Sequence, residues 1–167
     1  MNQQNSHELN TKKIKKIALV AHDNRKTDLS EWVKWNSKIL SKHHLVCTGT
    51  TGMMVEEALM ETLPKSDFEN VTITKLKSGP LGGDQQLGAM ISDDKIDILI
   101  FLWDPMQPQP HDVDVKALLR IATLYNIPTA INRSTADFII ASALFAADYK
   151  PVKKDYSVYL NRKWDQK

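Results

Sequence analysis

Residues 78–86 read Ser-Gly-Pro-Leu-Gly-Gly-Asp-Gln-Gln, and three of the chain's six glycines lie in this stretch. The strand-like segment Val71–Leu76 precedes it, and a helix-like segment, Asp84–Ser92, follows it. Because glycine has no Cβ, the backbone N–H groups of such a turn can come close to an anion. A glycine-rich turn between a strand and a helix N-terminus therefore predicts an anion-binding site.

Asp84, at the start of the predicted helix, allows two interpretations. The first is a helix N-cap, a position that aspartate often occupies because its side-chain oxygen accepts a backbone N–H bond. The second is a base held beside a bound phosphate ester, since a carboxylate would only repel the phosphate in a site that does nothing but bind it. Taken alone, the stretch favours the cap.

The whole chain shows strand-like and helix-like segments in alternation. The predicted strands are Ile17–Ala21, Leu45–Cys47, Val71–Leu76, Ile96–Leu102 and Pro128–Ile131. The predicted helices run from Thr27 or Asp28 to about His43 and over Met53–Leu63, Asp84–Ser92, Val115–Tyr125 and Ala136–Ala147, with Thr135 capping the last. This order predicts an α/β fold: a single doubly wound, mainly parallel five-stranded sheet, Rossmann-like, with helices on both faces. The strongest strand, Ile96–Leu102, is expected to be central.

Smaller patterns make further structural predictions. Trp32 is expected in the core because it follows the helical spacing of apolar residues, whereas Trp35 is expected to be partly exposed. The segment Pro64–Asn70 is predicted to be a surface loop. The tail Lys150–Lys167 combines aromatic and charged residues, and we expect it to dock on the domain or on another subunit.

Composition and charge exclude several classes of protein. At 167 residues, 42% hydrophobic and 25% charged, the chain is expected to form a single domain over residues 12–167 that ends in a C-terminal tail, with residues 1–11 as a flexible N-terminal extension. A net charge of +2 does not indicate a nucleic-acid partner. No apolar stretch reaches the ~18 residues of a membrane span, and the polar N-terminus lacks the apolar region of a signal peptide. The single cysteine, Cys47, excludes an intrachain disulfide, so we expect a cytoplasmic protein.

Polar residues gather where four of the predicted strands end. The clusters are His22-Asp23 with Lys26, Thr48–Gly52, Ser78–Asp84 and Asp104–Asp114. Ligands of open α/β sheets bind at the carboxyl ends of the strands, which share one edge of the sheet. Four such clusters on one edge exceed what loop composition alone would produce. Their convergence makes the base the stronger interpretation of Asp84.

The residue types in these clusters favour proton abstraction next to a carbonyl. Metal ligation has little support, because His22, His111 and the aspartates form no tight ligand motif. No serine lies in a G-x-S-x-G elbow, Cys47 lies inside a strand, and no G-x-G-x-x-G follows the first strand. Proton abstraction needs a carboxylate base, a neutral donor and a grip on the rest of the substrate. Asp84, His111 and the threonine-glycine loops with Lys26 can supply these three parts.

Five segments together resemble the methylglyoxal synthase family. They are Ala21-His22-Asp23, Thr48-Gly49-Thr50-Thr51-Gly52, Ser78–Gln86, Trp103-Asp104-Pro105 and Pro110-His111-Asp112-Val113-Asp114, in the family's order between Lys16 and Arg162. The resemblance implies a carbon–oxygen lyase of the cytoplasmic glycolytic bypass, which converts dihydroxyacetone phosphate to methylglyoxal and inorganic phosphate without a metal or an organic cofactor. It also implies a homohexamer for which inorganic phosphate is an allosteric inhibitor.

The same resemblance implies a role for each residue of the site. Asp84 would be the base that removes a carbon-bound proton to give an enediolate, and His111 would contact the carbonyl and hydroxyl oxygens of the substrate. The residues that would line the same pocket are His22, Asp104 and Asp114. The groups that would hold the phosphate are Lys26, Thr48, Thr50, Thr51, Ser78 and Gly79. Arg162 would reach a neighbouring subunit near Asp23.

A second function from a different class stays open at this point. The same fold serves as a regulatory domain in carbamoyl-phosphate synthetase, where it binds a small phosphorylated effector without catalysis. A domain of that kind would keep the threonine and glycine loops but would not need Asp84 and His111. Because this chain has both residues, the enzyme is the favoured interpretation.

Overall fold

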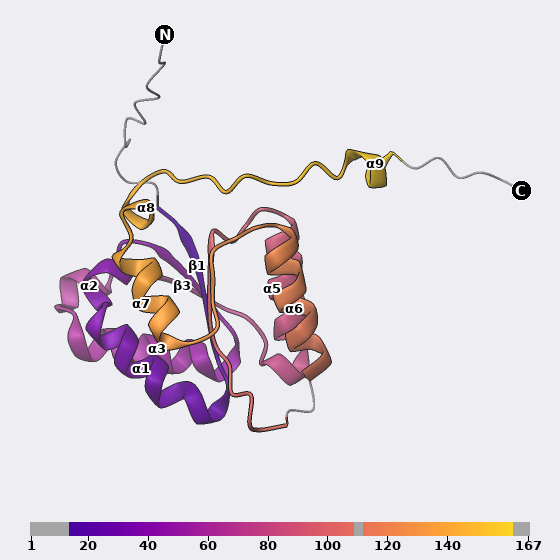
Figure 1. Cartoon of the computed structure of the whole chain (residues 1–167). Helices are drawn as coiled ribbons and strands as arrows, with labels where there is room; N and C mark the ends of the chain where they lie inside the picture. The colour runs from indigo at the N-terminus through magenta and orange to yellow at the C-terminus, as the bar shows by residue number, and fades with distance from the viewer. Residues whose placement is uncertain (1–13, 109–111, 162–167) are drawn as a thin grey trace, which may run out of the picture.

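Five parallel strands form one sheet in the computed structural model, which describes residues 14–108 and 112–161 (Figure 1). They are β1 (Lys16–Ala21), β2 (His44–Cys47), β3 (Thr72–Lys75), β4 (Ile98–Leu102) and β5 (Thr129–Ala130), in the order β3-β2-β1-β4-β5. The predicted doubly wound parallel sheet is thus confirmed. The prediction that Ile96–Leu102 forms the central strand is wrong: β1 is central, because the chain adds strands on one side of β1 and crosses to the other side after β3.

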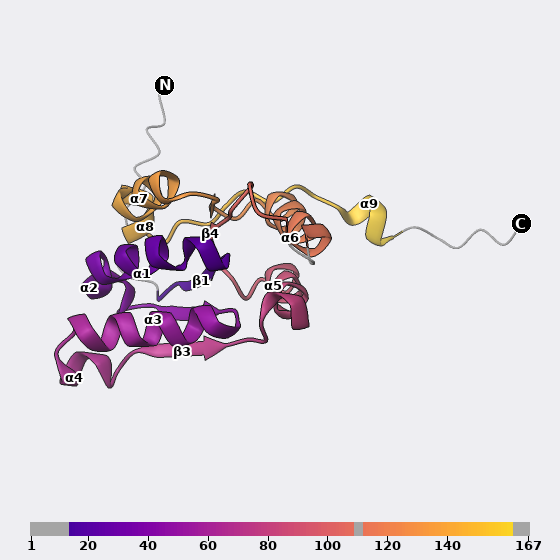
Figure 2. The same ribbon diagram turned by 90° about the horizontal axis from the view of Figure 1, so that it is seen from below.

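Helices cover both faces of the sheet (Figure 2). On one face lie α1 (Lys26–Trp35), α3 (Gly49–Thr62) and α7 (Arg133–Ala141), and on the other lie α5 (Gly83–Ser92) and α6 (Asp112–Leu124). The shorter elements are η1 (Asp23–Arg25), α2 (Ser37–Leu40), α4 (Lys65–Phe68), η2 (Gly79–Leu81), α8 (Ala143–Ala146) and α9 (Ser157–Leu160). In the part of the chain that the structure describes, no helix is long and apolar enough to cross a membrane.

Successive side chains of β1 enter opposite halves of the core. Ile17 and Leu19 pack with α1 and α3, whereas Ala18 and Val20 pack with α5 and α6. A strand buried on both faces needs apolar residues throughout, which explains the continuous apolar run. Trp32 lies in the core as predicted, but the side chain of Trp35 is 88% exposed, well beyond the partial exposure that we expected.

Two predicted helices are each broken into two pieces by a short polar side chain. The first breaks at Asn36, whose Nδ2 donates to the Trp32 carbonyl at 2.8 Å, so that α2 starts as a separate turn. The second breaks at Ser142, which is extended (φ −68°, ψ 141°) and whose hydroxyl accepts the N–H of Leu144 as the N-cap of α8. Asparagine and serine side chains compete in this way with backbone groups for hydrogen bonds. The spacing of apolar residues in the sequence does not reveal this competition.

Helix starts differ from the predicted ones in several places, and α6 begins at Asp112, before the predicted Val115. Gly49, and not Met53, begins α3, so the threonine-glycine segment forms the first turn of a helix. The predicted loop Pro64–Asn70 contains α4. The cap of α7 is Asn132, whose side chain accepts the N–H of Thr135, the residue predicted as the cap. Likewise, α1 begins at Lys26, before Thr27 and Asp28, and its N-cap position makes no side-chain hydrogen bond.

The described part of the tail runs along the ends of α5 and α6 before it leaves the body (Figure 1). Lys153 forms an ion pair with Asp94, which follows α5. Asn126, which follows α6, donates from Nδ2 to the Val152 carbonyl at 2.8 Å. The tail therefore docks on its own domain over these residues, one of the two positions predicted for it.

The turn between β3 and α5 needs glycine at two consecutive positions. Gly82 has φ +96°, a left-handed conformation that favours glycine. Gly83 is the first residue of α5, and a Cβ on it would lie 2.1 Å from the Lys77 carbonyl oxygen. The turn is closed by the Gly83 N–H, which donates to the Ser78 carbonyl at 2.9 Å, and by the Lys77 N–H, which donates to Gln86 Oε1 at 2.9 Å. These contacts fix where α5 starts.

We expect Gly83→Ala to destabilise the fold by about 1–3 kcal/mol, because the added methyl group overlaps the Lys77 carbonyl. Gly88→Ala is the matched control in the same helix: a Cβ there meets nothing within 4 Å. The control should be neutral or should stabilise by up to about 1 kcal/mol. Urea denaturation of the three proteins measures both values, and equal stabilities of the two variants would contradict the account of the turn.

Candidate functional site

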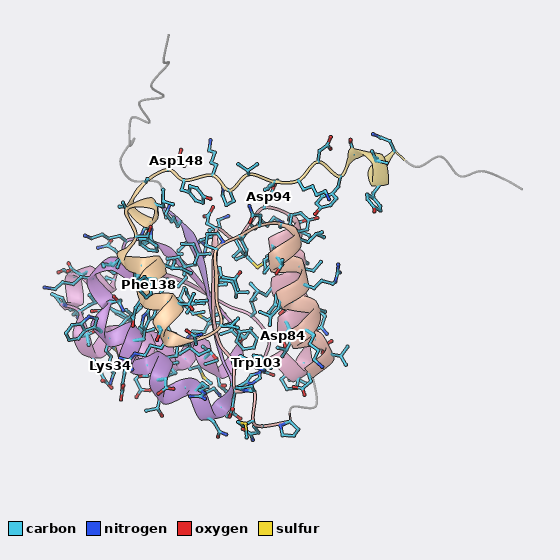
Figure 3. All side chains as sticks on the ribbon, viewed as in Figure 1. Lys34, Asp84, Asp94, Trp103, Phe138 and Asp148 are labelled. Atoms are coloured by element: carbon cyan, nitrogen blue, oxygen red, sulfur yellow. The ribbon has the colours of Figure 1, made fainter. Side chains whose placement is uncertain are left out.

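A cavity of about 310 Å³ opens at the carboxyl ends of β1, β2 and β3. Its lining consists of Val20, Ala21, His22, Asp23, Lys26, Thr48, Thr50, Thr51, Ser78, Gly79, Pro80, Asp84 and Phe101. Three of the four polar clusters predicted from the sequence therefore meet in one place. Figure 3 shows Asp84 on α5 and Trp103, after β4, at this end of the sheet, and Asp94 and Asp148 toward the opposite end. The cavity lies beside the point between β1 and β4 where the strand order reverses, which is where open α/β sheets bind ligands.

One wall of the cavity is formed by the first turn of α3. Thr48, its N-cap, and Thr51 are buried, and Thr50 lies between them in the chain. Helix N-termini carry partial positive charge, and threonine hydroxyls can donate to an anion. The Gly49 N–H donates to the carbonyls of Leu76 and Lys77, both at 3.1 Å, which ties this turn to the segment that carries Ser78. Two loops that are far apart in the sequence thus form one wall of groups that can donate hydrogen bonds to an anion.

Lys26 supplies a positive charge to the same wall. Its Nζ donates to the Thr50 hydroxyl and to Asp23 Oδ1, the latter at 2.6 Å. Lys26 is the first residue of α1, where the helix dipole disfavours a cation. Because this position does not help the helix, the placement of Lys26 indicates a role in the cavity.

Asp84 lines the cavity from the opposite side, with only 3% of the residue exposed. It lies in the first turn of α5, one residue inside the helix, and the N-cap is Gly82. The interpretation of Asp84 as an N-cap is therefore wrong, because the two glycines move the helix start ahead of it. Its carboxylate thus lies at the end of α5 that carries partial positive charge.

His22 and Asp104 form a connected pair at the ends of β1 and β4. Both residues are buried, and the Asp104 N–H donates to His22 Nδ1 at 3.3 Å. A ring nitrogen that accepts this bond carries no hydrogen, so a neutral His22 has its hydrogen on Nε2. The Phe101 ring stands edge-on to the imidazole at 5.2 Å and holds its plane. This geometry makes His22 a fixed hydrogen-bond donor through Nε2.

Asp104 stands behind His22 and is not among the residues that line the cavity. Its carboxylate accepts the N–H of Met106 at 3.0 Å and Nδ2 of Asn24 at 3.0 Å. The pKa of Asp104 is lowered chiefly by the Met106 hydrogen bond and then by the Asn24 hydrogen bond, with smaller effects of the Arg25 and His22 charges. Asn24 was not among the predicted site residues. The signal that the sequence offered was its position directly after His22-Asp23.

The remaining predicted residues are Asp114, Asp23, His111 and Arg162. Asp114, on α6, lines a neighbouring cavity of about 310 Å³ between α5 and α6, which Asp84 also lines. Asp23 lines the first cavity, exposes most of its side chain and pairs with Lys26. His111 and Arg162 lie outside the residues that the structure describes.

Cys47 is the last residue of β2 and directly precedes Thr48, which lines the cavity. Its own side chain is buried in the core. Burial raises the pKa of its thiol to about 12, with the Lys75 charge opposing the effect. Since the thiolate is the reactive form of cysteine, Cys47 is not available as a nucleophile at neutral pH. This agrees with the interpretation of the sequence, which placed Cys47 inside a strand.

The chain matches one protein-family model, described as an MGS-like domain, over residues 28–131. It is 60% identical over 154 residues to a protein named methylglyoxal synthase from Maridesulfovibrio salexigens, covering 90% of this chain and 98% of that protein. It is 54% identical over 149 residues to a methylglyoxal synthase from Coxiella burnetii strain RSA 493, covering 89% of this chain and 97% of that protein.

A solved structure shows the same similarity in three dimensions. The crystal structure of methylglyoxal synthase from Elizabethkingia anophelis NUHP1 superimposes with a TM-score of 0.80 at 47% sequence identity. The match covers 92% of this chain and 95% of that one. Sequence and structure comparisons thus agree over nearly the whole length of both proteins.

We expect Asn24→Ala to raise the pKa of Asp104 toward its ordinary value, because the variant removes one of the two hydrogen bonds that favour the carboxylate. A carboxyl group with a lowered pKa stabilises the fold above its unfolded pKa, and this contribution is lost as the pH falls through the folded pKa. The variant should therefore be less stable at neutral pH and equal to the parent in acid. An NMR titration of the Asp104 carboxyl carbon, with urea denaturation at both pH values, measures this.

Asn126→Ala is the control, since Asn126 donates to a neutral carbonyl, that of Val152, at the other end of the sheet. It should leave the pKa of Asp104 unchanged. An unchanged pKa in Asn24→Ala would show that Asn24 does not hold the Asp104 carboxylate.

Proposed function

This chain belongs to the methylglyoxal synthase family of enzymes, and on that premise we propose that it converts dihydroxyacetone phosphate to methylglyoxal and inorganic phosphate in the cavity at the ends of β1, β2 and β3. The observation that carries the proposal is that a buried carboxylate, Asp84, and a wall of anion-binding groups face one cavity. The regulatory alternative is less supported, because the relatives match at full length and carry the enzyme's name.

The phosphate of the substrate belongs against the wall formed by α3 and Lys26. The groups that we assign to it are Lys26, Thr48, Thr50, Thr51, Ser78 and Gly79, all of which line the cavity. Together they supply one ammonium, several hydroxyls and the N-terminus of a helix of 14 residues. The negative charge of the ester would then be held at one end of the cavity, away from the reacting carbons.

Asp84 acts as the general base in this proposal. Its carboxylate takes a proton from the hydroxyl-bearing carbon of dihydroxyacetone phosphate, and the electrons of that C–H bond give an enediolate. The enediolate expels phosphate, which leaves with the electron pair of the C–O bond and takes up the proton that Asp84 removed, so that the carboxylate is restored. The enol that remains loses its hydroxyl proton, gains a proton at its terminal carbon and becomes methylglyoxal. Burial of Asp84 supports this role, because a base shielded from water keeps its reactivity for the substrate.

The direction of the C–O bond decides which product forms. Elimination needs this bond perpendicular to the enediolate plane, whereas an isomerase must hold it in the plane. The phosphate-binding groups set that torsion, so they control the product as much as Asp84 does. The Lys26 Nζ and the first turn of α3, held together through the Thr50 hydroxyl, are the groups that we propose for this task.

Neutral hydrogen-bond donors would stabilise the oxygens of the enediolate. His22 is suited to this, since the Asp104 N–H fixes its hydrogen on Nε2. The family resemblance gives His111 the main contact with the substrate oxygens. Asp114, on the far side of Asp84, would assist the base through the neighbouring cavity.

Assembly and regulation are further parts of the proposal that come from the family resemblance. We propose a cytoplasmic homohexamer of the glycolytic bypass, inhibited allosterically by inorganic phosphate, in which Arg162 reaches a neighbouring subunit near Asp23. The Asp23–Lys26 ion pair supports a link to the active site, because a guanidinium that engages Asp23 would alter the hold on Lys26. No metal or organic cofactor enters any step.

Replacement of Asp84 by asparagine keeps the shape of the side chain but removes the base. We expect Asp84→Asn to lower kcat by about 10²–10⁴-fold while inorganic phosphate still binds, because a general base contributes that much. Methylglyoxal and released phosphate should be assayed together on purified protein given dihydroxyacetone phosphate. The parent should produce both in equal amounts.

The control is Asp93→Asn, at the exposed C-terminal end of the same helix, where Asp93 pairs with Lys95. It should keep the activity of the parent. Near-full activity in Asp84→Asn would remove Asp84 as the base. If the parent binds substrate but releases no product, the regulatory alternative holds instead.

Lys26→Ala should raise KM for dihydroxyacetone phosphate by about tenfold or more, because a hydrogen bond to a charged group contributes about 1.5–3 kcal/mol. Stability should change little, since the Lys26 side chain is partly exposed. Lys34→Ala is the matched control: it removes a lysine from the outer part of α1 that pairs with Glu61. An unchanged KM in Lys26→Ala would exclude Lys26 from the phosphate site.

A further inference from the structure

A second cavity, of about 320 Å³, lies at the opposite end of the sheet and shares no lining residue with the first. It is lined by Lys15, Asp97, Ile98, Pro128, Thr135, Phe138, Ile139, Ser142, Leu144, Phe145, Tyr149 and Pro151. These residues come from the starts of β1, β4 and β5, from α7 and α8, and from the tail. The volume falls within the ~300–1,000 Å³ that is typical of small-molecule sites. Nothing in the proposed reaction uses this cavity.

Lys15 is the unusual member of this lining, because it is a charged residue with only 5% of its surface exposed. Its Nζ donates to the Ala147 carbonyl at 2.7 Å. An ammonium group has three N–H donors, and within residues 14–108 and 112–161 this carbonyl is the only hydrogen-bond acceptor of Nζ and no carboxylate forms an ion pair with it. A buried ammonium group that donates to one neutral carbonyl keeps two N–H donors for a ligand, and its charge favours an anion.

The rest of the lining is mainly apolar, and part of it is exposed to water. Phe145 is buried at the base, whereas Phe138 is 81% exposed and Leu144 is 52% exposed at the mouth. Figure 3 labels Phe138 on α7. Apolar side chains gathered around a concave opening mark a surface that binds an apolar group. The walls therefore favour a ligand with an apolar body.

Two other titratable groups, His43 and Asp97, lie near Lys15. His43 accepts the Lys15 backbone N–H at its Nδ1 and faces the Phe145 ring at 5.2 Å. Burial first, and then the charges of Lys15 and Lys42, lower the pKa of His43, so it is neutral at pH 7. Asp97 lines the cavity, and its Oδ2 accepts the Lys16 backbone N–H at 2.7 Å. Lys15 is therefore the positively charged group of the lining, and the Asp97 carboxylate is held by the Lys16 N–H.

We propose that this second cavity binds a small organic anion with an apolar body, of the class of aryl-substituted or aliphatic carboxylates. Its charged group pairs with the Lys15 ammonium, and its apolar body lies between Phe138, Ile139, Leu144 and Phe145. The charge complementarity and the apolar walls select this class over inorganic phosphate, which has no apolar part. The proposal does not depend on the reaction assigned to the first cavity.

The first test uses 8-anilinonaphthalene-1-sulfonate, a fluorescent anion with an apolar body, titrated into the full chain. Binding should be saturable, and Lys15→Met should raise Kd by about tenfold or more, since a charged hydrogen bond is lost. Methionine keeps the length and apolar character of the lysine stem, which limits damage to the fold. Lys16→Met is the matched control, because Lys16 is exposed and does not line the cavity. It should leave Kd unchanged.

A second pair of variants keeps the test valid if Lys15→Met does not fold. Leu144→Glu and Leu144→Gln place side chains of the same size at the exposed mouth and differ only in charge. The glutamate should weaken binding of the anionic probe relative to the glutamine. Competition gives a further readout: 4-phenylbutyrate should displace the probe, whereas the uncharged 4-phenylbutan-1-ol should do so at least about tenfold less well.

Several outcomes would overturn the proposal. One is an equal rise in the Kd of the probe for Lys15→Met and Lys16→Met. Another is equal displacement of the probe by 4-phenylbutyrate and by 4-phenylbutan-1-ol. Displacement of the probe by inorganic phosphate, and not by 4-phenylbutyrate, would place it in the first cavity. No saturable binding by the full chain would show that the second cavity is closed to small ligands, for instance by a second copy of the chain.

Discussion

The parallel pairing of β1 with both β2 and β4 is the constraint on which the rest of the structure depends. Its register places Leu19 opposite Cys47 and Ala21 opposite Leu102, so the three strands end at nearly the same level. The residues that follow β1 and β2 therefore line one cavity, and the N–H of Asp104, which follows β4, donates to His22 in that lining. A shift of one residue in any strand would turn its side chains to the other face and remove its contribution. The apolar packing of β1 on both faces holds this register in place.

The N-termini of two helices, α5 and α3, both face the cavity at this end of the sheet. The proposed reaction brings a carboxylate close to the anionic phosphate of the substrate, and these two groups repel each other. The structure separates them by putting Asp84 at the N-terminus of one helix and the anion-binding hydroxyls at the N-terminus of another, α3. Each negative charge then has its own helix dipole. Lys26, at an unfavourable position for α1, adds the cation that the anion needs.

The sequence allowed the sheet and most of the cavity lining to be predicted, because both depend on apolar periodicity and on polar residues after strands. It did not reveal the helix breaks at Asn36 and Ser142, which arise from single side-chain hydrogen bonds. For the same reason the sequence did not reveal the contact between Asn24 and Asp104, which is also a single side-chain hydrogen bond and joins residues 80 positions apart. The cap interpretation of Asp84 failed for a related reason, since only the backbone of the turn shows which residue starts the helix.

The most direct test of the central claim is a crystal structure of the protein with 2-phosphoglycolate, whose planar carboxylate resembles the enediolate. The account predicts phosphate oxygens about 2.7–3.2 Å from the Lys26 ammonium and from donors in the first turn of α3, with the carboxylate of the analogue against Asp84. A phosphate bound instead in the neighbouring cavity of about 450 Å³ that Arg25 and Arg133 line would contradict it. So would an analogue whose carboxylate lies away from Asp84.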